Sequence, residues 1–566
     1  MKKNLIVLMV CSLLVGGSLI PSFFSKNIVK SSSIDSEGVV LGVSPDGKGW
    51  LAEYNGQLIL FLSGTGYEMG YQQGYLLKEE IRRSINGYVY GGEELNGNPP
   101  EALQALYTAQ KPYIPQRYKD EMQGMADVSG IPLIDIQAYN VKSDKGPLAC
   151  RQIALWGNAT VDGNLYHGRS LGYPITFRDD NSGVAIQDHA LVIIAKPEGY
   201  YPFVNLAWPG SVGGVTGMNI QGISLAINDV LSTDTTPYGM TRTFRLRKVL
   251  EEAKSIDEAI RILNESKTVG WCMCLGDGKI PEAYGVEMNG NLFYAGPWND
   301  PVEYYNADCE EHGFPPYEPL EGCVIRFGHM YRDPRLAETR LSPKTGELAG
   351  YSCQSAHYYT HMQMIIDHYG EWNADLLKNL LYELADPIAT NLHLVVFSSS
   401  TRDFKISNAI GSKPAQYFPS CSMNLGVLAN MEPPSMNPDD IPTVQISSPD
   451  GGSTIHWFQN KVTIKGIATD NTKISEVYVK VDGKDYELAE GKETWKKTID
   501  TSSWEKGSWH RIKVLAIDES DNGDIDIIGV KKAGVLDDLL SYKLPGNIEW
   551  IHDLFFSPWT YKNLSM

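Results

Sequence analysis

The pattern of hydrophobic residues changes at Cys150, and this change limits the folds open to the chain. Before Cys150, apolar residues recur at helical spacing over 64–90, 118–128 and 134–141. After it, short runs of β-branched and aromatic residues are separated by glycine turns. Strands in series, with helices in groups, predict an α+β protein whose helices pack on a largely antiparallel sheet.

The expected elements follow this pattern to the end of the first large domain. Strands are expected over 151–160, 164–171, 189–195, 203–208, 223–228, 271–275, 283–288 and 392–397, and helices over 243–253, 256–264 and 374–384.

A proline-rich stretch over 431–441 is typical of a linker. Beyond it, alternating segments at 444–446, 462–467, 477–481, 495–499 and 512–516 predict a small all-β sandwich over 442–535. The runs SPDGGSTI, VKVDGK and KVLAIDESDNG resemble bacterial immunoglobulin-like modules of extracellular enzymes. The tail 536–566 carries Trp550, Phe555, Phe556 and Trp559, and both packing on a domain and contact with a membrane stay open for it.

Composition argues against nucleic-acid binding. The 566 residues carry a net charge of −19, with 68 acidic and 49 basic residues, and no stripe of lysine and arginine. A phosphate-binding surface needs such a stripe. Hydrophobic residues make up 42% of the chain, which is enough for a globular core.

The N-terminus has the features of an export signal. Lys2 and Lys3 precede an apolar run over 5–20, so residues 1–30 are expected to be a signal peptide or a retained membrane anchor. Residues 31–149 are then a leader and a mostly helical first segment. We expect a secreted or extracellular protein, membrane-anchored if the segment is not cleaved.

Eight cysteines are present, of which Cys11 lies in the export segment. If Cys150 is reserved for chemistry, an even number remains, which permits three disulfides: Cys272, Cys274, Cys309, Cys323, Cys353 and Cys421. Cys272 and Cys274 form a C-x-C in a strand and share one face. No second C-x-C or paired histidine accompanies them, so packing or disulfides are favoured over a metal site.

Cys150 stands at the junction between the helical segment and the first strand. A nucleophilic cysteine usually needs a separate base, and no histidine is obviously placed for that role. Breaking the Ala149–Cys150 bond would give Cys150 a free α-amine with a pKa of about 7.7–8.0, able to take the thiol proton. The same thiol can attack the Ala149 carbonyl. The alternative is a buried structural cysteine.

Five segments in order resemble the acyl-coenzyme A:6-aminopenicillanic-acid acyltransferase family, a group of self-processing N-terminal-nucleophile (Ntn) hydrolases. They cover about 60–430: GTGYEMGYQQGYLLKEEI, YKDEMQGMADVSGIPLIDIQAYN, CRQIALWGNATVDGNLYHGRSLGY, GMNIQGISLAIND and NLHLVVFSSSTRDFKISNA. The resemblance implies a four-layer αββα sandwich around the new N-terminus.

The resemblance also implies roles for single residues. Cys150 is the nucleophile, and Ala149–Cys150 is the processing site. Arg169 lies beside the thiol, where a cation favours the thiolate, with a strand salt bridge as the alternative. Asn228 contributes to the oxyanion hole, with a turn residue as the alternative. Asn306 is a weaker second oxyanion candidate, chosen by its order along the chain.

One position departs from the family pattern. Gly172 stands where the family carries an aspartate that contacts the cysteine amine, and Tyr173 follows it. Asp179, Asp180 or Asp229 are the acids that substitute if the chemistry is kept. Otherwise the chemistry is altered or the chain is an inactive relative.

Two other motifs carry less weight. His357, His361 and His368 invite a zinc interpretation, but position 358 is tyrosine rather than glutamate, so a polar helix face is favoured. The glycine-rich run 210–217 lacks the end of a phosphate loop, and we expect a turn near the active cleft.

These observations predict an exported, self-processing hydrolase or acyltransferase. It would act on a small linear amide through an acyl-cysteine, without a cofactor, as a heterodimer of its two fragments. Tyr173 and Trp208, with Tyr166 and Phe203, line an apolar acyl pocket or belong to the core. The rival hypotheses are an inert secreted binding or structural protein, and a phospholipase-B-like or ceramidase-like lipid hydrolase.

Overall fold

The computed structural model describes residues 38–91, 99–145, 149–304, 318–343, 345–349, 355–384 and 391–534. The expected signal or anchor over 1–30, Asn306, Cys309, Cys353 and the tail 536–566 lie outside these residues. Within them, no helix is both long enough and apolar enough to cross a membrane.

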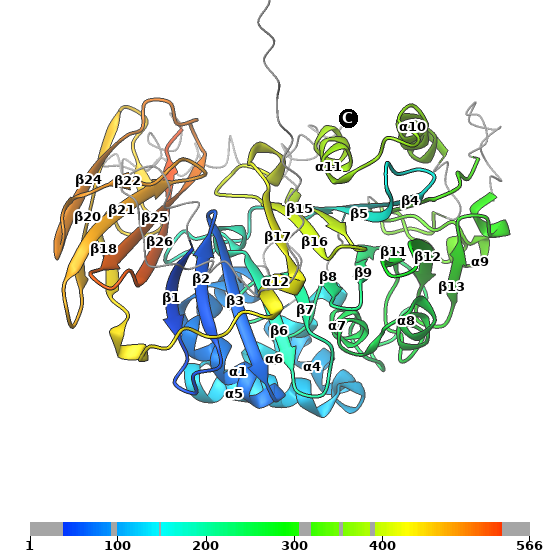
Figure 1. The fold of residues 1–566 in the computed structure, drawn as a ribbon, viewed down its shortest axis with the longest axis horizontal. Coiled ribbons are helices and arrows are strands. Elements are labelled where there is room, and N and C mark those ends of the chain that lie inside the picture. Colours follow the sequence, from blue (N-terminus) through cyan, green and yellow to red (C-terminus); the bar gives the residue numbers. More distant parts are fainter. Residues whose placement is uncertain are drawn as a thin grey trace, which may run out of the picture.

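Two stacked β-sheets form the centre of the body over residues 38–430 (Figure 1). The larger sheet has the order β1-β2-β3-β6-β7-β8-β9-β11-β12-β13, with β10 beside β11. Its strands are β1 (Val39–Val43), β2 (Trp50–Tyr54), β3 (Gln57–Gly64), β6 (Leu191–Pro197), β7 (Phe203–Ala207), β8 (Thr216–Asn219), β9 (Ile223–Ala226), β10 (Asn228–Asp229), β11 (Trp271–Asp277), β12 (Glu282–Met288) and β13 (Phe293–Pro297).

The smaller sheet has the order β14-β4-β5-β15-β16-β17. Its strands are β14 (Cys323–Phe327), β4 (Ala149–Gly157), β5 (Gly163–Gly172), β15 (Asn391–Ser398), β16 (Asp403–Asn408) and β17 (Cys421–Asn424). The pairs within it are antiparallel, as the sequence pattern predicts.

Helices cover the outer face of each sheet (Figure 1). Those on the larger sheet are α1 (Gly66–Leu76), α2 (Lys78–Ile85), α4 (Pro100–Gln110), α5 (Gln116–Ser129), α6 (Leu133–Val141), α7 (Arg242–Glu252) and α8 (Ile256–Leu263), and those on the smaller sheet are α10 (Ser355–Ile366) and α11 (Ala374–Glu383). Side chains of β3 show the layers, because Leu60 packs with the helices while Phe61 packs with strands of the smaller sheet. The predicted αββα fold is confirmed.

Strands β1 to β3 occupy residues that we expected to be a leader and helical segment. The run in β3 is buried at five consecutive positions, so it lacks the alternation that marks a half-exposed strand. Strand β3 also pairs in parallel with β6, more than a hundred residues away, and no local pattern reveals such a pairing. The helical expectation holds from α1 to α6.

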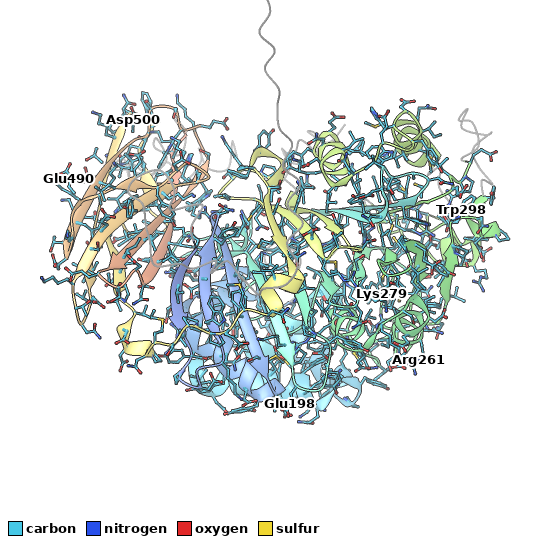
Figure 2. The ribbon with its side chains drawn as sticks, in the orientation of Figure 1. Glu198, Arg261, Lys279, Trp298, Glu490 and Asp500 are labelled. Carbon is cyan, nitrogen blue, oxygen red and sulfur yellow. The ribbon has the colours of Figure 1, made fainter. Side chains whose placement is uncertain are left out.

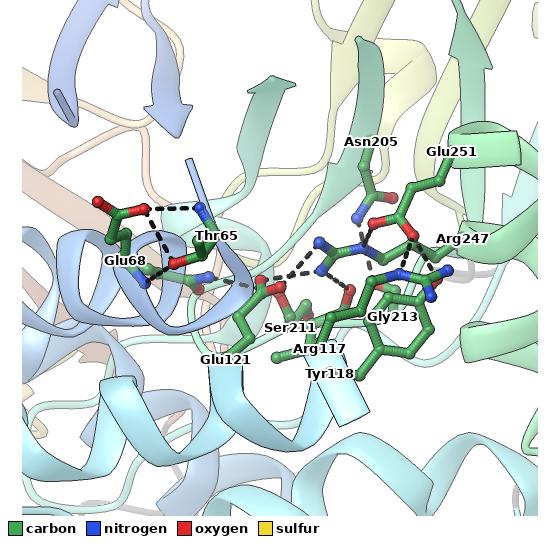
Figure 3. Close-up of polar contacts among 12 residues, drawn as sticks. Thr65, Glu68, Arg117, Tyr118, Glu121, Asn205, Ser211, Gly213, Arg247 and Glu251 are labelled. Carbon is green, nitrogen blue, oxygen red and sulfur yellow. Dashed lines mark hydrogen bonds and ion pairs between the residues drawn. The ribbon is translucent and has the colours of Figure 1, made fainter. Parts of the chain in front are cut away.

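Helices α1 and α5 cross with their backbones in contact, because a glycine of each helix faces the main chain of the other. A Cβ at Gly70 would overlap the carbonyl oxygen of Glu121, and one at Gly124 would overlap the carbonyl oxygen of Tyr67. At the start of α1, Thr65 and Glu68 form a reciprocal capping box (Figure 3). These contacts give a structural reason for the glycines in the motif over 64–81.

A buried charge network joins α5 to α7 (Figure 3). Arg247 pairs with Glu121 at 2.7 Å and with Glu251 at 2.9 Å, and all three side chains are buried. Arg247 also donates to the Val212 carbonyl at 2.7 Å, and Asn205 donates to the Gly213 carbonyl at 3.1 Å. The network therefore fixes the glycine-rich connection between β7 and β8.

Residues 443–532 form the predicted immunoglobulin-like sandwich. One sheet has the order β18-β20-β24-β23 and the other β19-β26-β25-β21-β22. The strands are β18 (Thr443–Ser448), β19 (Thr454–Ile455), β20 (Lys461–Thr469), β21 (Ile474–Val481), β22 (Glu487–Leu488), β23 (Glu490–Gly491), β24 (Thr494–Asp500), β25 (Trp509–Asp518) and β26 (Gly523–Lys532). Trp495 lies at the centre of its core.

Four of the six cysteines considered for disulfides are free thiols: Cys272, Cys274, Cys323 and Cys421. A framework of three disulfides is therefore wrong for this structure. Cys272 and Cys274 lie buried on one face of β11 and donate to carbonyls of β14 and its C-terminal end, at 3.2 Å and 3.4 Å. The packing interpretation of the C-x-C is confirmed.

Candidate active site

The hairpin of β4 and β5 positions the candidate nucleophile. Cys150 lies opposite Leu171 in the antiparallel register, and Gln152 lies opposite Arg169. Side chains alternate along a strand, so Cys150, Gln152 and Ala154 share one face. Gln152 donates to the Ala226 carbonyl of the larger sheet at 3.0 Å, which shows that this face looks into the space between the sheets.

Arg169 contacts the thiol directly. Its Nη2 donates to Cys150 Sγ at 3.4 Å and to the Ile227 carbonyl at 2.7 Å. Its Nη1 donates to Thr216 Oγ1 and lies 3.0 Å from His393 Nε2. A guanidinium has no acceptor, so His393 accepts through a neutral ring nitrogen. Burial holds the pKa of His393 well below its usual value, in agreement with that state.

The charge of Arg169 has the thiol as its acidic partner. Arg169 is fully buried, and within the described part of the chain no carboxylate forms an ion pair with it. The alternative of a strand salt bridge is thus not found there. Cys150 is 3% exposed. Burial raises the pKa of its thiol, while Arg169 and the backbone N–H of Gly172 act to lower it.

Asn228 of β10 belongs to the same buried layer and contacts Gln152, which lies two positions along β4 from Cys150. Its Oδ1 accepts from Gln152 Nε2 at 2.7 Å, and its Nδ2 donates to the Arg326 carbonyl at 3.0 Å. Both ends of the amide are therefore fixed by protein groups, and among the described residues one N–H of Nδ2 makes no hydrogen bond. Asn306, the other oxyanion candidate, lies outside the described residues.

Of the three acids considered as substitutes at the Gly172 position, Asp229 is the one whose charge acts on Cys150, raising the pKa of the thiol. Asp179 instead accepts from Ser182 at 2.6 Å in a loop, and Asp180 is exposed. Asp229 follows Asn228 in β10, and its backbone oxygen accepts from His329 N at 2.6 Å. The neighbouring Gly328 N donates to the Cys150 carbonyl at 2.7 Å.

Arg242 connects Asp229 to the segment that precedes the predicted processing site. It donates to Asp229 Oδ1 and to the Ser143 carbonyl, and its Nε lies 3.8 Å from Asp144. Asp144 also accepts from Thr241 at 2.9 Å and Thr268 at 3.0 Å. The chain is therefore anchored on both sides of 146–148, which lie outside the described residues.

An apolar pocket opens beside the nucleophile hairpin. It is lined by Tyr88, Tyr139, Asn140, Ser143, Leu171, Tyr173, Ile186, Ala207, Trp208, Ser211, Gly213, Val215, Thr243 and Leu392. Tyr173 and Trp208 therefore both line this pocket. Leu171 is the register partner of Cys150, so the pocket reaches the strand position opposite Cys150.

Aromatic rings form much of this wall. Tyr88 lies edge-on to Tyr139 and Tyr173, with ring centroids 5.6 Å and 6.1 Å apart. Trp208 stacks on His393 at 6.2 Å. Of the other aromatics considered, Tyr166 packs on the smaller sheet with α11, and Phe203 belongs to the core of the larger sheet.

Thr216, His393 and Tyr88 were missed by the sequence analysis. His393 carried a signal, because it is the one ionisable residue in the apolar run of β15. Thr216 and Tyr88 carried none, since their roles depend on contacts between distant segments.

The remaining sequence candidates find structural roles. His361 packs edge-on against Phe327 at 4.6 Å, and His368 pairs with Glu371 on the surface at 3.2 Å. The side chain of His357 lies outside the described residues, among which no cluster suited to a metal ion occurs. The run 210–217 connects β7 to β8, and its Gly213 lines the pocket as expected.

Comparison with known proteins agrees with this geometry. The acyl-coenzyme A:6-aminopenicillanic acid acyl-transferase model matches residues 180–274, and the bacterial Ig domain model matches residues 442–514. The resemblance to the acyl-transferase family is confirmed. The match includes Asn228 and Asp229, whereas Cys150 and Arg169 precede it.

Three relatives illustrate the similarity of the acyl-transferase-like body. An uncharacterized protein of Archaeoglobus fulgidus is 26% identical over 391 residues, which cover 62% of this chain and 62% of that protein. Acid ceramidase of Rattus norvegicus is 27% identical over 208 residues, covering 34% of this chain and 50% of the ceramidase. The solved Caenorhabditis elegans N-acylethanolamine-hydrolyzing acid amidase ortholog aligns with a TM-score of 0.31 at 14% identity, over 44% of this chain and 93% of that one. The chain thus spans less than two thirds of either curated relative.

Proposed function

We propose that this chain is a self-processing cysteine amidohydrolase or N-acyltransferase. The observation that carries the proposal is the buried contact between Arg169 and Cys150 Sγ at 3.4 Å, in a layer where the thiol is the acidic partner of the guanidinium. An unpaired buried cation costs free energy, and a thiolate offsets that cost. Arg169 therefore makes the nucleophilic form of Cys150 accessible despite its burial.

Self-processing uses the thiol on its own chain. Cys150 Sγ attacks the carbonyl carbon of Ala149, and the peptide C–N bond breaks as its nitrogen takes up the thiol proton. The product is a thioester between Ala149 and Cys150 Sγ, together with a free Cys150 α-amine. Water then cleaves the thioester and leaves a carboxylate on Ala149 and a free thiol.

Turnover repeats this chemistry on an external amide. The new α-amine takes the thiol proton, and the thiolate attacks the acyl carbonyl. The leaving amine departs with that proton, and an acyl-cysteine remains. Water or a second amine resolves it. Asn228 Nδ2 is the candidate donor to the oxyanion in both tetrahedral intermediates.

We assign to Asp229 the role that the family gives to an aspartate at the Gly172 position. Its charge favours the ammonium form of the Cys150 amine, and Arg242 restrains it. The Gly172 backbone N–H favours the thiolate, since it lowers the pKa of Cys150.

The pocket lining supports an apolar acyl group on the substrate. The similarity to rat acid ceramidase favours an N-acyl amide as the substrate. An inert Ntn-like protein stays as the rival, and the bacterial Ig match is compatible with an extracellular site of action.

The intact mass of freshly purified and stored protein tests the proposal. We expect two fragments, the second beginning at Cys150, and hydrolysis of N-acyl amides. Cys150→Ala should remain one chain and lose turnover by at least about 10³-fold, because the nucleophile is gone. Cys421→Ala, at a buried free thiol of β17 four strands away from β4, is the matched control. An intact parent chain that still hydrolyses amides would refute the mechanism.

A further inference from the structure

The immunoglobulin-like domain shares a hydrophobic core with the acyl-transferase-like body. Leu515 and Ile517 of β25 belong to the same buried cluster as Leu41 and Leu51 of the larger sheet. Figure 1 shows the domain beside β1 and β2, at the edge of that sheet. Such a core is unlike the flexible attachment of a tethered module.

Buried polar contacts reinforce this interface. Lys513 of β25 pairs with Glu53 of β2, and Tyr486 donates to the same carboxylate at 3.0 Å. Glu53 and Lys513 are both at most 5% exposed. Breaking a buried pair of this kind leaves an unpaired charge, so the two units are held in one arrangement.

The domain also clamps the segment 174–190, which leads from the nucleophile hairpin to β6. Gly529 N donates to the Ser182 carbonyl at 2.9 Å, and a Cβ at Gly529 would overlap the carbonyl oxygen of Gly183. The Arg178 guanidinium lies over the Trp509 ring at 4.2 Å.

A second set of contacts fixes the end of this segment. Arg511 of β25 donates to the Asp188 carbonyl at 3.2 Å and to the Asp482 carbonyl at 3.0 Å. The Asp188 carboxylate in turn accepts from Ala185 N at 3.0 Å and from Gly411 N at 2.7 Å. The immunoglobulin-like domain therefore holds Asp188 in place, and Asp188 holds the backbone just before Ile186.

The clamped segment is a wall of the acyl pocket. Ile186 of this segment and Tyr173, which directly precedes it, both line the pocket. Gln187 joins the two parts of the segment, since its Nε2 donates to the Ile175 carbonyl at 2.9 Å. The pocket has about 70 Å³ of space for water-sized groups, which corresponds to roughly five to seven such groups. With the wall in this position, the enclosed part of the pocket holds an acyl group of about four to six carbons.

We propose that the immunoglobulin-like domain sets the acyl-length limit of the pocket by holding this wall, and that the substrates are amides of short acyl groups. The inference rests on the proposed function, which names the pocket as the acyl site. Arg511 is a positioning residue, because it acts through Asp188 and does not touch the substrate.

The test compares N-butyryl and N-dodecanoyl amides of one leaving amine. The parent enzyme should prefer the butyryl amide in kcat/KM. Arg511→Met should raise the dodecanoyl-to-butyryl ratio by about tenfold while changing the butyryl kcat by less than about twofold, because it loses the hydrogen bond to the Asp188 carbonyl that holds the wall. Arg511→Lys should restore part of the parent ratio.

Two further variants serve as a second test of the clamp and as a control. Trp509→Ala removes the ring under Arg178 and should shift the dodecanoyl-to-butyryl ratio in the same direction. This variant keeps the inference testable if Arg511→Met fails to fold. Lys496→Met is the control, since Lys496 is exposed and pairs with Glu490 at the outer edge of the domain (Figure 2). A parent that prefers the dodecanoyl amide, or clamp variants with the parent ratio, would overturn the inference.

Ligand binding separates this inference from the proposed function. Calorimetry with butyrate and dodecanoate on Cys150→Ala protein needs no chemistry. We expect butyrate to bind the parent pocket, and dodecanoate to bind measurably when Arg511→Met is added. That result, with no amide turnover by the parent protein that keeps Cys150, would contradict the proposed function alone. Two results would contradict this inference: no binding of butyrate, or tighter binding of dodecanoate than of butyrate in protein that keeps Arg511.

Discussion

At the nucleophile, burial and a neighbouring cation act on the same thiol in opposite directions. Burial raises the pKa of Cys150, and Arg169 lowers it. The balance depends on Arg169 keeping its charge in a layer where its other partners are neutral: Thr216, His393 and the Ile227 carbonyl. The site is therefore sensitive to any change in that one cation.

We expect Arg169→Met to raise the apparent pKa of Cys150 further, because burial then acts without an opposing charge. The rate of alkylation of Cys150 by iodoacetamide, followed against pH by peptide mass spectrometry, measures this pKa. Amide turnover near pH 7 should fall by about 10²-fold or more. Arg402→Met, which removes a half-buried arginine bound to carbonyls elsewhere, should leave the alkylation profile in place. An unchanged profile in Arg169→Met would show that the arginine does not act on the thiol.

Lys142 gives a second prediction at this scale. It is buried, donates to the Tyr88 carbonyl and lies 4.5 Å from the Tyr88 ring centroid. Burial lowers the pKa of Lys142 to about 8, against about 10.4 for an exposed lysine. Between these values the unfolded chain binds more protons than the folded one, so this lysine makes stability rise with pH from about 8 to 10.4.

Lys142→Met should therefore be more stable than the parent at pH 7, and the difference should shrink by pH 9.5. Urea unfolding of both proteins at the two pH values measures it. Lys405→Met, at a partly exposed lysine paired with Asp375, should show no such trend. A difference that is constant with pH would mean that Lys142 titrates normally.

The residue scale also shows where sequence reasoning stops. Cys150 and Arg169 could be named from their motif, because the hairpin that joins them is local. Tyr173 and Trp208 could be named as pocket candidates from composition, but not distinguished from Tyr166 and Phe203, which pack elsewhere. That distinction depends on which face of each strand meets the other sheet.

At the scale of elements, the crossing of α1 and α5 depends on backbone contact. Gly70 and Gly124 let the two helices approach until main chain meets main chain. The ion pairs of Arg247 then tie α5 to α7 and to the loop that lines the pocket. The outer helical layer is thus connected to the acyl site through α7.

Gly70→Ala should destabilise the protein by about 1–3 kcal/mol or more, because the new methyl group overlaps the Glu121 carbonyl. Thermal unfolding measures the loss. Gly426→Ala is the helical control, since its Cβ would meet no atom closer than 3.1 Å. Equal melting temperatures for Gly70→Ala and the parent would show that the crossing can widen freely.

Element prediction succeeded where period and turn signals were local, as in β5, α7 and β25. It failed for β1 to β3 because their apolar residues are buried on both faces. It also left open how the immunoglobulin-like domain sits on the body. The residues that fix it, such as Glu53 and Lys513, are hundreds of positions apart and look like ordinary surface charges in the sequence.

At the scale of the whole molecule, the predicted cleavage divides a single core. Strand β3, from the first fragment, lies between β2 and β6 and pairs with β6 at seven positions. Helices α1 to α6 contribute to the same buried cluster as α7 and α8. A cut before Cys150 therefore breaks the backbone but leaves the two fragments packed in one fold.

We expect the two fragments to elute together in size-exclusion chromatography under native conditions and to separate only in denaturant. The pairing of β3 with β6 and the shared hydrophobic core hold the two fragments together. Cys150→Ala, which should stay uncut, gives the reference elution volume. Separate elution of the fragments in buffer would contradict the interleaved arrangement.

The interleaving of β3 with β6 has a consequence for how such a protein is made. A continuous precursor brings its strands together at a rate that does not depend on concentration. Once cut, a denatured molecule must find its other half by diffusion, so recovery becomes a second-order process that slows on dilution. The persistence of the cleaved form then depends on slow unfolding, because the covalent link that lets the precursor fold as one chain is lost on cleavage.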